Sequence, residues 1–290
     1  MLYVDPLIQK LIGTLKAQYG DNIIAIYGIG SYFDSTLPSD WRKNDLDVLV
    51  IVEDLDPIQK KDWTDVRFET LELDAHKVWV GFNTLEAYES KEKFAAHSFT
   101  NYEWSLLELK SPHNSRQLYG INIRAQLPEV IDLQFDYDDI LARALYHFDK
   151  SIQKERRQKL EESKRSFTKG VFKLGFYLSI LHDKTFSRTS IKQIDRKIHQ
   201  LMKKGKVDRK IYEVLAECIK YRRGKPAFSE NFVRDRNQFL VLLFTLLAKG
   251  ELHRRMRYTE LTQYLATTFS GLKHLRKLLE TLKSRFNSID

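Results

Sequence analysis

The chain has 290 residues, of which 42% are hydrophobic and 30% are charged, so it can bury a core and is not a wholly disordered protein. Its single cysteine, Cys218, excludes an internal disulfide and a four-cysteine zinc site. The longest nearly continuous apolar segment, residues 239–248, is about half as long as a membrane-spanning helix needs to be. We therefore expect a cytoplasmic protein with no membrane partner and no leader peptide.

The net charge of +9 is divided unevenly along the chain. Residues 1–140 contain 13 Lys and Arg against 24 Asp and Glu, a net charge of −11, whereas residues 141–290 contain 35 against 15, a net charge of +20. This asymmetry predicts two domains, which we place at 1–136 and 137–290. The basic part is expected to attract a polyanion such as RNA; the alternative is a basic surface that is solvated or docks on the acidic part.

The first part begins with a helix and continues into strands. Asp5 followed by Pro6 predicts a helix start, and Gly20 is suited to end that helix. Residues 23–27 and 46–52 are short, apolar and rich in β-branched side chains, as buried strands are.

The rest of the acidic part is expected to complete a small sheet. Residues 66–73 and 76–82 are predicted to pair as strands across a turn. Residues 104–109 fit either a strand or a helix, and Ser111-Pro112 and Tyr119-Gly120 indicate loops. The first part is therefore expected to be an α/β or α+β unit.

From Tyr137 onward, helical patterns dominate. Apolar residues at spacings of three and four recur in residues 167–181, 211–219, 231–249 and 272–282. The fold class that we predict is a mixed sheet with helices, followed by an all-α bundle.

One constellation in the acidic part carries chemistry. The first strand runs into Gly28, Gly30 and Ser31, and after a further thirteen residues come Asp45 and Asp47. Residues two apart in a strand point to the same face, so the two carboxylates can hold a magnesium ion together with substrate phosphates. The glycines allow close backbone approach, and Ser31 is expected to open a helix whose free amides bind phosphate.

At these residues the chain resembles the nucleotidyltransferase superfamily typified by DNA polymerase beta. That family has a Gly followed by Gly or Ser, a spacer, and Asp-x-Asp or Asp-x-Glu in a strand; Gly30-Ser31 and Asp45-Leu46-Asp47 correspond to these parts. The resemblance implies that Asp45 and Asp47 bind Mg²⁺ and that Gly30 and Ser31 hold a nucleoside triphosphate such as ATP. It also implies a transfer of the nucleoside monophosphate to an acceptor hydroxyl with release of pyrophosphate.

The chain departs from the family at the third carboxylate, which usually stands on a later strand. Our alignment places Trp79 at that position. Either another acid substitutes, the alignment is shifted, or the protein binds nucleotide without efficient transfer. The acids nearest in sequence are Glu69, Glu72, Asp74 and Glu103.

The basic part offers further candidates. Lys169 and Lys173 are four apart on a predicted helix and could bind the triphosphate; the alternative is a solvated basic stripe. The favoured function is a magnesium-dependent nucleotidyltransferase with an RNA acceptor. Its rivals are a transferase for small molecules, as in antibiotic-modifying members of the superfamily, and a non-catalytic nucleotide- or RNA-binding protein.

Overall fold

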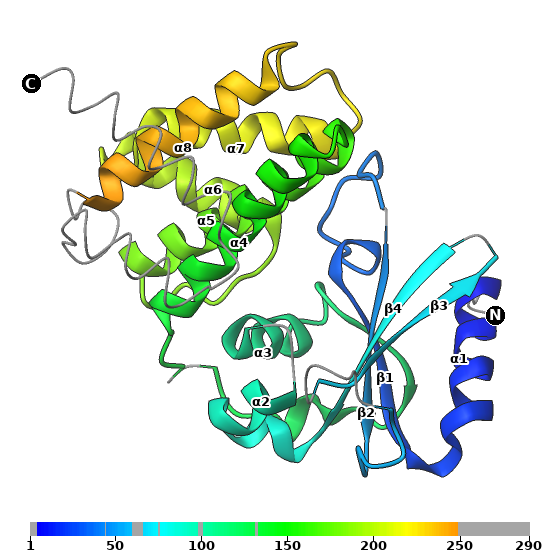
Figure 1. Cartoon of the computed structure of the whole chain (residues 1–290). Helices are drawn as coiled ribbons and strands as arrows, with labels where there is room; N and C mark the ends of the chain where they lie inside the picture. Colours follow the sequence, from blue (N-terminus) through cyan, green and yellow to red (C-terminus); the bar gives the residue numbers. More distant parts are fainter. Residues whose placement is uncertain are drawn as a thin grey trace, which may run out of the picture. The chain divides into compact units, whose positions relative to one another are not determined.

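The computed structural model describes residues 5–43, 45–59, 66–74, 76–97, 101–130 and 133–248, without the side chains of 95–97 and 248 (Figure 1). By its internal contacts the chain divides into two compact units: Met1–Phe135 with Ser187–Ser190, and Asp136–Phe186 with Ile191–Asp290. The first unit contains the sheet, and the described part of the second is helical.

The first unit opens with the predicted helix, α1 (Pro6–Tyr19). The Asp5 carboxylate accepts a hydrogen bond from the Leu7 amide, and Pro6 occupies the first turn, where its missing N–H costs nothing. Gly20 ends the helix at a φ of +53°, a backbone region that favours glycine. The amphipathic pattern buries Leu7, Ile8, Leu11 and Leu15.

The sheet has five strands in the order β3-β4-β2-β1-β5. The strands are β1 (Ile23–Ile29), β2 (Leu46–Val52), β3 (Phe68–Leu73), β4 (His76–Thr84) and β5 (Arg116–Gly120). The β2–β4 pair is parallel and the other three pairs are antiparallel, so the sheet is mixed, as predicted.

Helices cover both faces of this sheet (Figure 1). On one face, α1 packs on a core that includes Val48, Val50 and Val80. On the other, Leu49 and Ile51 pack with Leu106 and other apolar side chains of the α2 (Lys91–His97) and α3 (Tyr102–Lys110) region. The described residues of the unit also form short 3₁₀ turns: η1 (Gly20–Asn22), η2 (Gly30–Tyr32), η3 (Glu86–Glu89) and η4 (Ile123–Ala125).

Two local predictions were resolved or corrected by tertiary context. The ambiguous segment 104–109 lies in α3, where the Asn101 side chain caps the helix by accepting from the Trp104 amide. The expected loop at Tyr119-Gly120 is wrong, because both residues belong to β5. That strand obtains its ladder hydrogen bonds from β1, a partner about ninety positions earlier that local patterning does not reveal.

The second unit is helical over its described residues, as predicted. Its helices are α4 (Tyr137–Arg156), α5 (Leu160–His182), α6 (Ile191–Lys203), α7 (Arg209–Arg222) and α8 (Phe232–Ala248). The predicted stripe at 272–282 lies outside the described residues. Helices α4 and α5 pack closely, with Phe148 against Phe167 at a centroid separation of 5.6 Å. These findings confirm the predicted fold class.

No helix within the described residues is long and apolar enough to cross a membrane. The segment 239–248, the most apolar in the sequence, lies in α8, and its first residues Phe239, Leu240 and Leu243 are buried in the second unit. Its hydrophobicity is therefore explained by packing.

The α4–α5 contact generates a stability prediction. A Cβ added at Gly170 would lie 2.6 Å from Cδ1 of the buried Phe148 ring and 3.1 Å from the Ala144 carbonyl oxygen. Gly170→Ala is therefore expected to lower the free energy of unfolding of the second unit by about 1–3 kcal/mol. Urea denaturation followed by circular dichroism measures the effect.

Gly13 supplies the matched control, since it also lies inside a helix but would have nothing within 4 Å of an added Cβ. Gly13→Ala is expected to stabilise the first unit by about 0.4–1 kcal/mol, because alanine reduces the entropy of the unfolded chain. Stabilisation by both substitutions would contradict the close α4–α5 packing.

Candidate functional site

The antiparallel pairing of β1 and β2 brings the two halves of the predicted motif together. Ile29, at the end of β1, is the register partner of Asp47 near the start of β2. Asp45 comes directly before β2, and both carboxylate residues are half-buried. The residues after β1 and the acids at the start of β2 therefore meet at one end of this strand pair, although fourteen or more positions separate them in sequence.

Gly30 lies directly against Asp47. Its φ is +72°, and an added Cβ would stand 2.9 Å from Oδ2 of Asp47. Glycine is thus required here both by the backbone conformation and by the approach of the carboxylate. Gly28 is required for another reason, because the Phe33 ring covers it and would meet an added Cβ at 2.3 Å.

The expected helix at Ser31 is wrong. Gly30–Tyr32 forms a single 3₁₀ turn, and the chain then enters a loop in which the Asp34 carboxylate accepts from the Thr36 amide at 2.8 Å. This side-chain turn, with Pro38 following, competes with helix formation. A phosphate at Ser31 would therefore rely on backbone and hydroxyl donors of a tight turn, without the dipole of a helix.

The structure reveals an acid that the sequence analysis missed. The Gly30 amide donates a hydrogen bond of 3.0 Å to Oε1 of Glu108, a half-buried residue of α3. Glu108 and Asp47 thus both lie against Gly30. The sequence signal was the one charged residue in the apolar stretch 104–109, which becomes informative once that stretch is known to be a helix packed on the sheet.

Trp79, which the sequence alignment set at the position of the third carboxylate, lies on β4 next to β2. Trp79 on β4 is the parallel partner of Asp47, so the position beside Asp47 holds an indole ring and no carboxylate. Glu69 lies on β3 one residue before the partner of Trp79, which puts it on the opposite face, where it accepts from the Tyr19 hydroxyl at 3.0 Å. Burial and the adjacent Glu69 charge raise the pKa of Tyr19.

The other three candidates are placed differently. Asp74, in the β3–β4 turn, forms an exposed ion pair with Lys10 of α1. Glu72 is exposed and is the register partner of Lys77 in the β3–β4 ladder. Glu103 is fully buried at the start of α3. Of the acids considered, Glu108 is thus the one for which the structure provides a direct contact with the Gly30 turn.

The donor set at this edge suits a hard divalent cation. Asp45 and Asp47 lie two residues apart at the start of β2, and Mg²⁺ commonly uses one or two carboxylates and completes its octahedron with water and substrate phosphates. Among the described residues, no group of three or more His, Cys, Asp and Glu side chains is arranged to hold a metal by itself.

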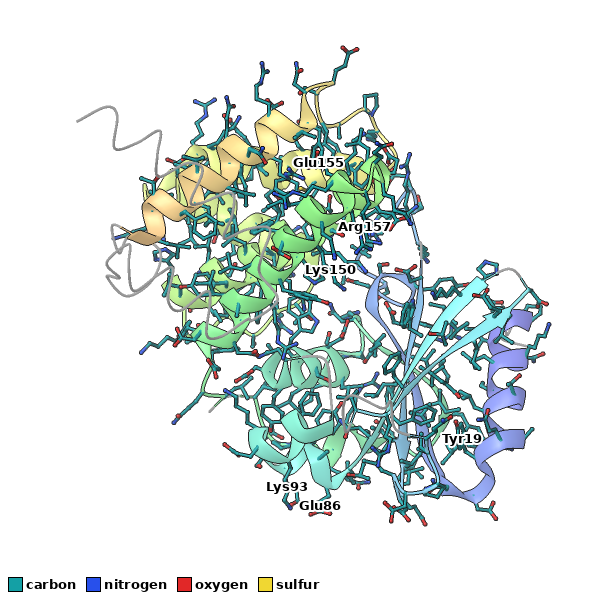
Figure 2. All side chains as sticks on the ribbon, viewed as in Figure 1. Tyr19, Glu86, Lys93, Lys150, Glu155 and Arg157 are labelled. Atoms are coloured by element: carbon teal, nitrogen blue, oxygen red, sulfur yellow. The ribbon has the colours of Figure 1, made fainter. Side chains whose placement is uncertain are left out.

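Lys169 and Lys173 lie on α5, in the other compact unit. Their neighbour is His147 on α4, which the charges of Lys173, Lys169, Lys150 and Arg143 also surround. Desolvation, with these charges, lowers the pKa of His147 to about 3, so its imidazole is neutral at physiological pH. Lys150 marks this part of α4 in Figure 2. The two lysines thus belong to a cluster of cations.

Comparisons with known proteins find likeness among solved structures. No family model matches the chain, and no curated protein matches it. Among solved structures, the chain is similar to a nucleotidyltransferase-like protein from Exiguobacterium sibiricum 255-15, with 13% sequence identity and a TM-score of 0.28. That similarity covers 97% of this chain and 91% of the other.

Proposed function

We propose that this chain is a magnesium-dependent nucleotidyltransferase that moves a nucleoside monophosphate from a nucleoside triphosphate to an acceptor hydroxyl on RNA. The observation that carries the proposal is the contact between Gly30 and Asp47 at the junction of β1 and β2. A glycine turn held against Asp47, with Asp45 two residues away in sequence, combines a place for phosphate with ligands for a cation.

The reaction follows from charge and position. A bound Mg²⁺ would supply positive charge that offsets the carboxylates and the triphosphate. Asp45 and Asp47 would hold that ion, while backbone donors of the turn at Gly30 and Ser31 would orient the phosphates. The acceptor oxygen then forms a bond to the α-phosphorus, the bond from that phosphorus to the bridging oxygen breaks, and pyrophosphate leaves. The proton of the acceptor hydroxyl passes to Glu108, which takes the role of the missing strand carboxylate.

Asp45 and Asp47 are tested by isosteric replacement. Asp45→Asn and Asp47→Asn each keep the side-chain shape and remove a negative charge, so turnover is expected to fall by about 10²–10³-fold or more. The magnesium-dependent part of triphosphate affinity should weaken in parallel. Incubation with α-labelled triphosphates and total RNA, and equilibrium binding with and without Mg²⁺, measure the two effects.

Ser31→Ala is expected to have a smaller effect, because backbone amides carry part of the phosphate contact. If both asparagine variants transfer label as the wild type does, the metal site is assigned to the wrong residues. If the wild type binds triphosphate and transfers nothing, the non-catalytic alternative replaces the transferase.

Glu108 is tested separately from the metal ligands. Glu108→Gln keeps a carbonyl oxygen that can accept from the Gly30 amide but cannot take a proton. Because general-base assistance contributes about 10²–10⁴-fold, kcat is expected to fall by that factor while triphosphate binding is retained. Glu72→Gln, an exposed acid of the same sheet, is the control and should leave kcat unchanged. Wild-type kcat in Glu108→Gln would exclude Glu108 as the base.

An RNA acceptor is supported by the charge of the second part of the chain, +20 over residues 141–290. Arg156 and Arg157, at the C-terminal end of α4, are exposed, and so are Lys203 and Lys204 at the C-terminal end of α6. Arg222 precedes Arg223 in sequence but is buried in α7, so these two arginines do not form a further exposed basic pair. Figure 2 shows Arg157 at the end of α4.

The RNA contact predicts a strong salt dependence. Replacing Arg156 and Arg157 together by glutamine should reduce the magnitude of the slope of log affinity against log salt by up to about 1.4–1.8. The variant should also lose the same factor of affinity for RNAs of unrelated sequence. Filter binding over a salt series measures it. Lys93→Gln is the control, since Lys93 is paired with Glu86 at 2.6 Å and Glu89 at 2.9 Å. Salt-insensitive or absent RNA binding would favour a small-molecule acceptor.

A further inference from the structure

An exposed indole ring stands beside the proposed metal ligands. Trp79 retains 39% of its surface, although it lies on β4 in the interior of the sheet order. As the register partner of Asp47, it shares a face with that carboxylate, one strand spacing of about 4.8 Å away. A large aromatic side chain that stays exposed on a central strand leaves apolar surface in contact with water, which costs free energy unless a ligand covers it.

Two neighbours define the surroundings of the ring. Phe68 on β3 is a diagonal cross-strand neighbour whose ring lies 6.2 Å from that of Trp79, with an angle of 26° between the planes. Nζ of the exposed Lys77, two residues before Trp79, lies 4.6 Å from the centroid of the indole. The three side chains form a small aromatic and cationic surface, which we call the Trp79 platform.

We propose that the Trp79 platform binds a nucleobase by stacking, next to the site where the phosphates are held; the inference rests on the proposed function. Every nucleobase offers a flat π-face, and stacking on an indole tolerates different bases. The Lys77 contact does not prevent this, because an exposed cation–π contact is weaker than base–aromatic stacking. Once displaced, the Lys77 ammonium is free to pair with a nucleotide phosphate.

The stacked ring could come from two sources that share this chemistry. It is either the base of the nucleoside triphosphate or the base at the acceptor end of an RNA strand. Both would place a ribose close to Asp47, since the platform and the carboxylate occupy adjacent strands. The experiment therefore presents the two sources in separate arms.

Tryptophan fluorescence provides a direct measure of stacking. The full chain is titrated with ATP, GTP, CTP and UTP in one arm and with short single-stranded RNA bearing a free 3′-hydroxyl in the other. Quenching is expected in at least one arm and should disappear in Trp79→Phe, which keeps a ring but removes the indole. Trp41→Phe removes a buried indole, 5% exposed, and should keep the quenching.

Affinity separates stacking from phosphate binding. Trp79→Leu should weaken binding of the quenching ligand by about 5- to 150-fold, whereas Trp79→Phe should weaken it less. Inorganic triphosphate, which carries no nucleobase, should not quench the fluorescence. Its affinity for Trp79→Leu should equal its affinity for the wild type. Circular dichroism establishes that the variants are folded.

The outcomes keep this inference apart from the proposed function. Wild-type affinity for every nucleotide and RNA in a folded Trp79→Leu, with quenching that survives in Trp79→Phe, overturns the platform and makes Trp79 a packing residue. If RNA still quenches the fluorescence of Asp45→Asn and the wild type transfers no nucleotide, the Trp79 platform is supported and the transferase function is overturned. Unaltered KM and kcat in Trp79→Leu would count against the platform even in an active enzyme.

Discussion

The close approach of Gly30 to Asp47 is the constraint on which the candidate site depends. The antiparallel register of β1 and β2 fixes Ile29 opposite Asp47, and the chain must then turn within a residue. With an added Cβ only 2.9 Å from Oδ2 of Asp47 and a φ of +72°, no side chain is tolerated at Gly30 without strain. The amide of Gly30 donates to Glu108, so one residue contacts both carboxylates.

Charge at this edge explains why a cation is part of the proposed function. Asp45, Asp47 and Glu108 are acidic, and the first 140 residues carry a net charge of −11. A triphosphate would be repelled by such a site unless positive charge were supplied, and hard carboxylate oxygens are the ligands that Mg²⁺ prefers. The basic residues of the chain gather in the second unit, where burial and four nearby cations lower the pKa of His147 to about 3. Net negative charge is thus found in the first part of the chain and net positive charge in the second.

The residue beside Asp47 changes the chemistry available at the sheet. Trp79 cannot take a proton or bind a metal, so the proposed proton acceptor is Glu108, which lies on a helix and not on a strand. Its exposed ring, with Phe68 and Lys77, offers apolar and cationic surface in exchange. An indole in place of a carboxylate at position 79 is then compatible with the proposed transfer if Glu108 of α3 accepts the proton and the Trp79 platform binds a nucleobase.

The sequence by itself determined the local features: the cap at Asp5, the strands around Gly28 and Asp47, the helical second part and the Gly30-Ser31 and Asp45-Asp47 motif. These depend on side-chain periodicity and on glycine and proline chemistry within a few residues. Tertiary structure alone decided that Tyr119-Gly120 joins a strand, that Ser31 opens no helix, and that Glu108 reaches Gly30 across 78 positions. Such features depend on pairing and packing between distant segments, whose register no local pattern encodes.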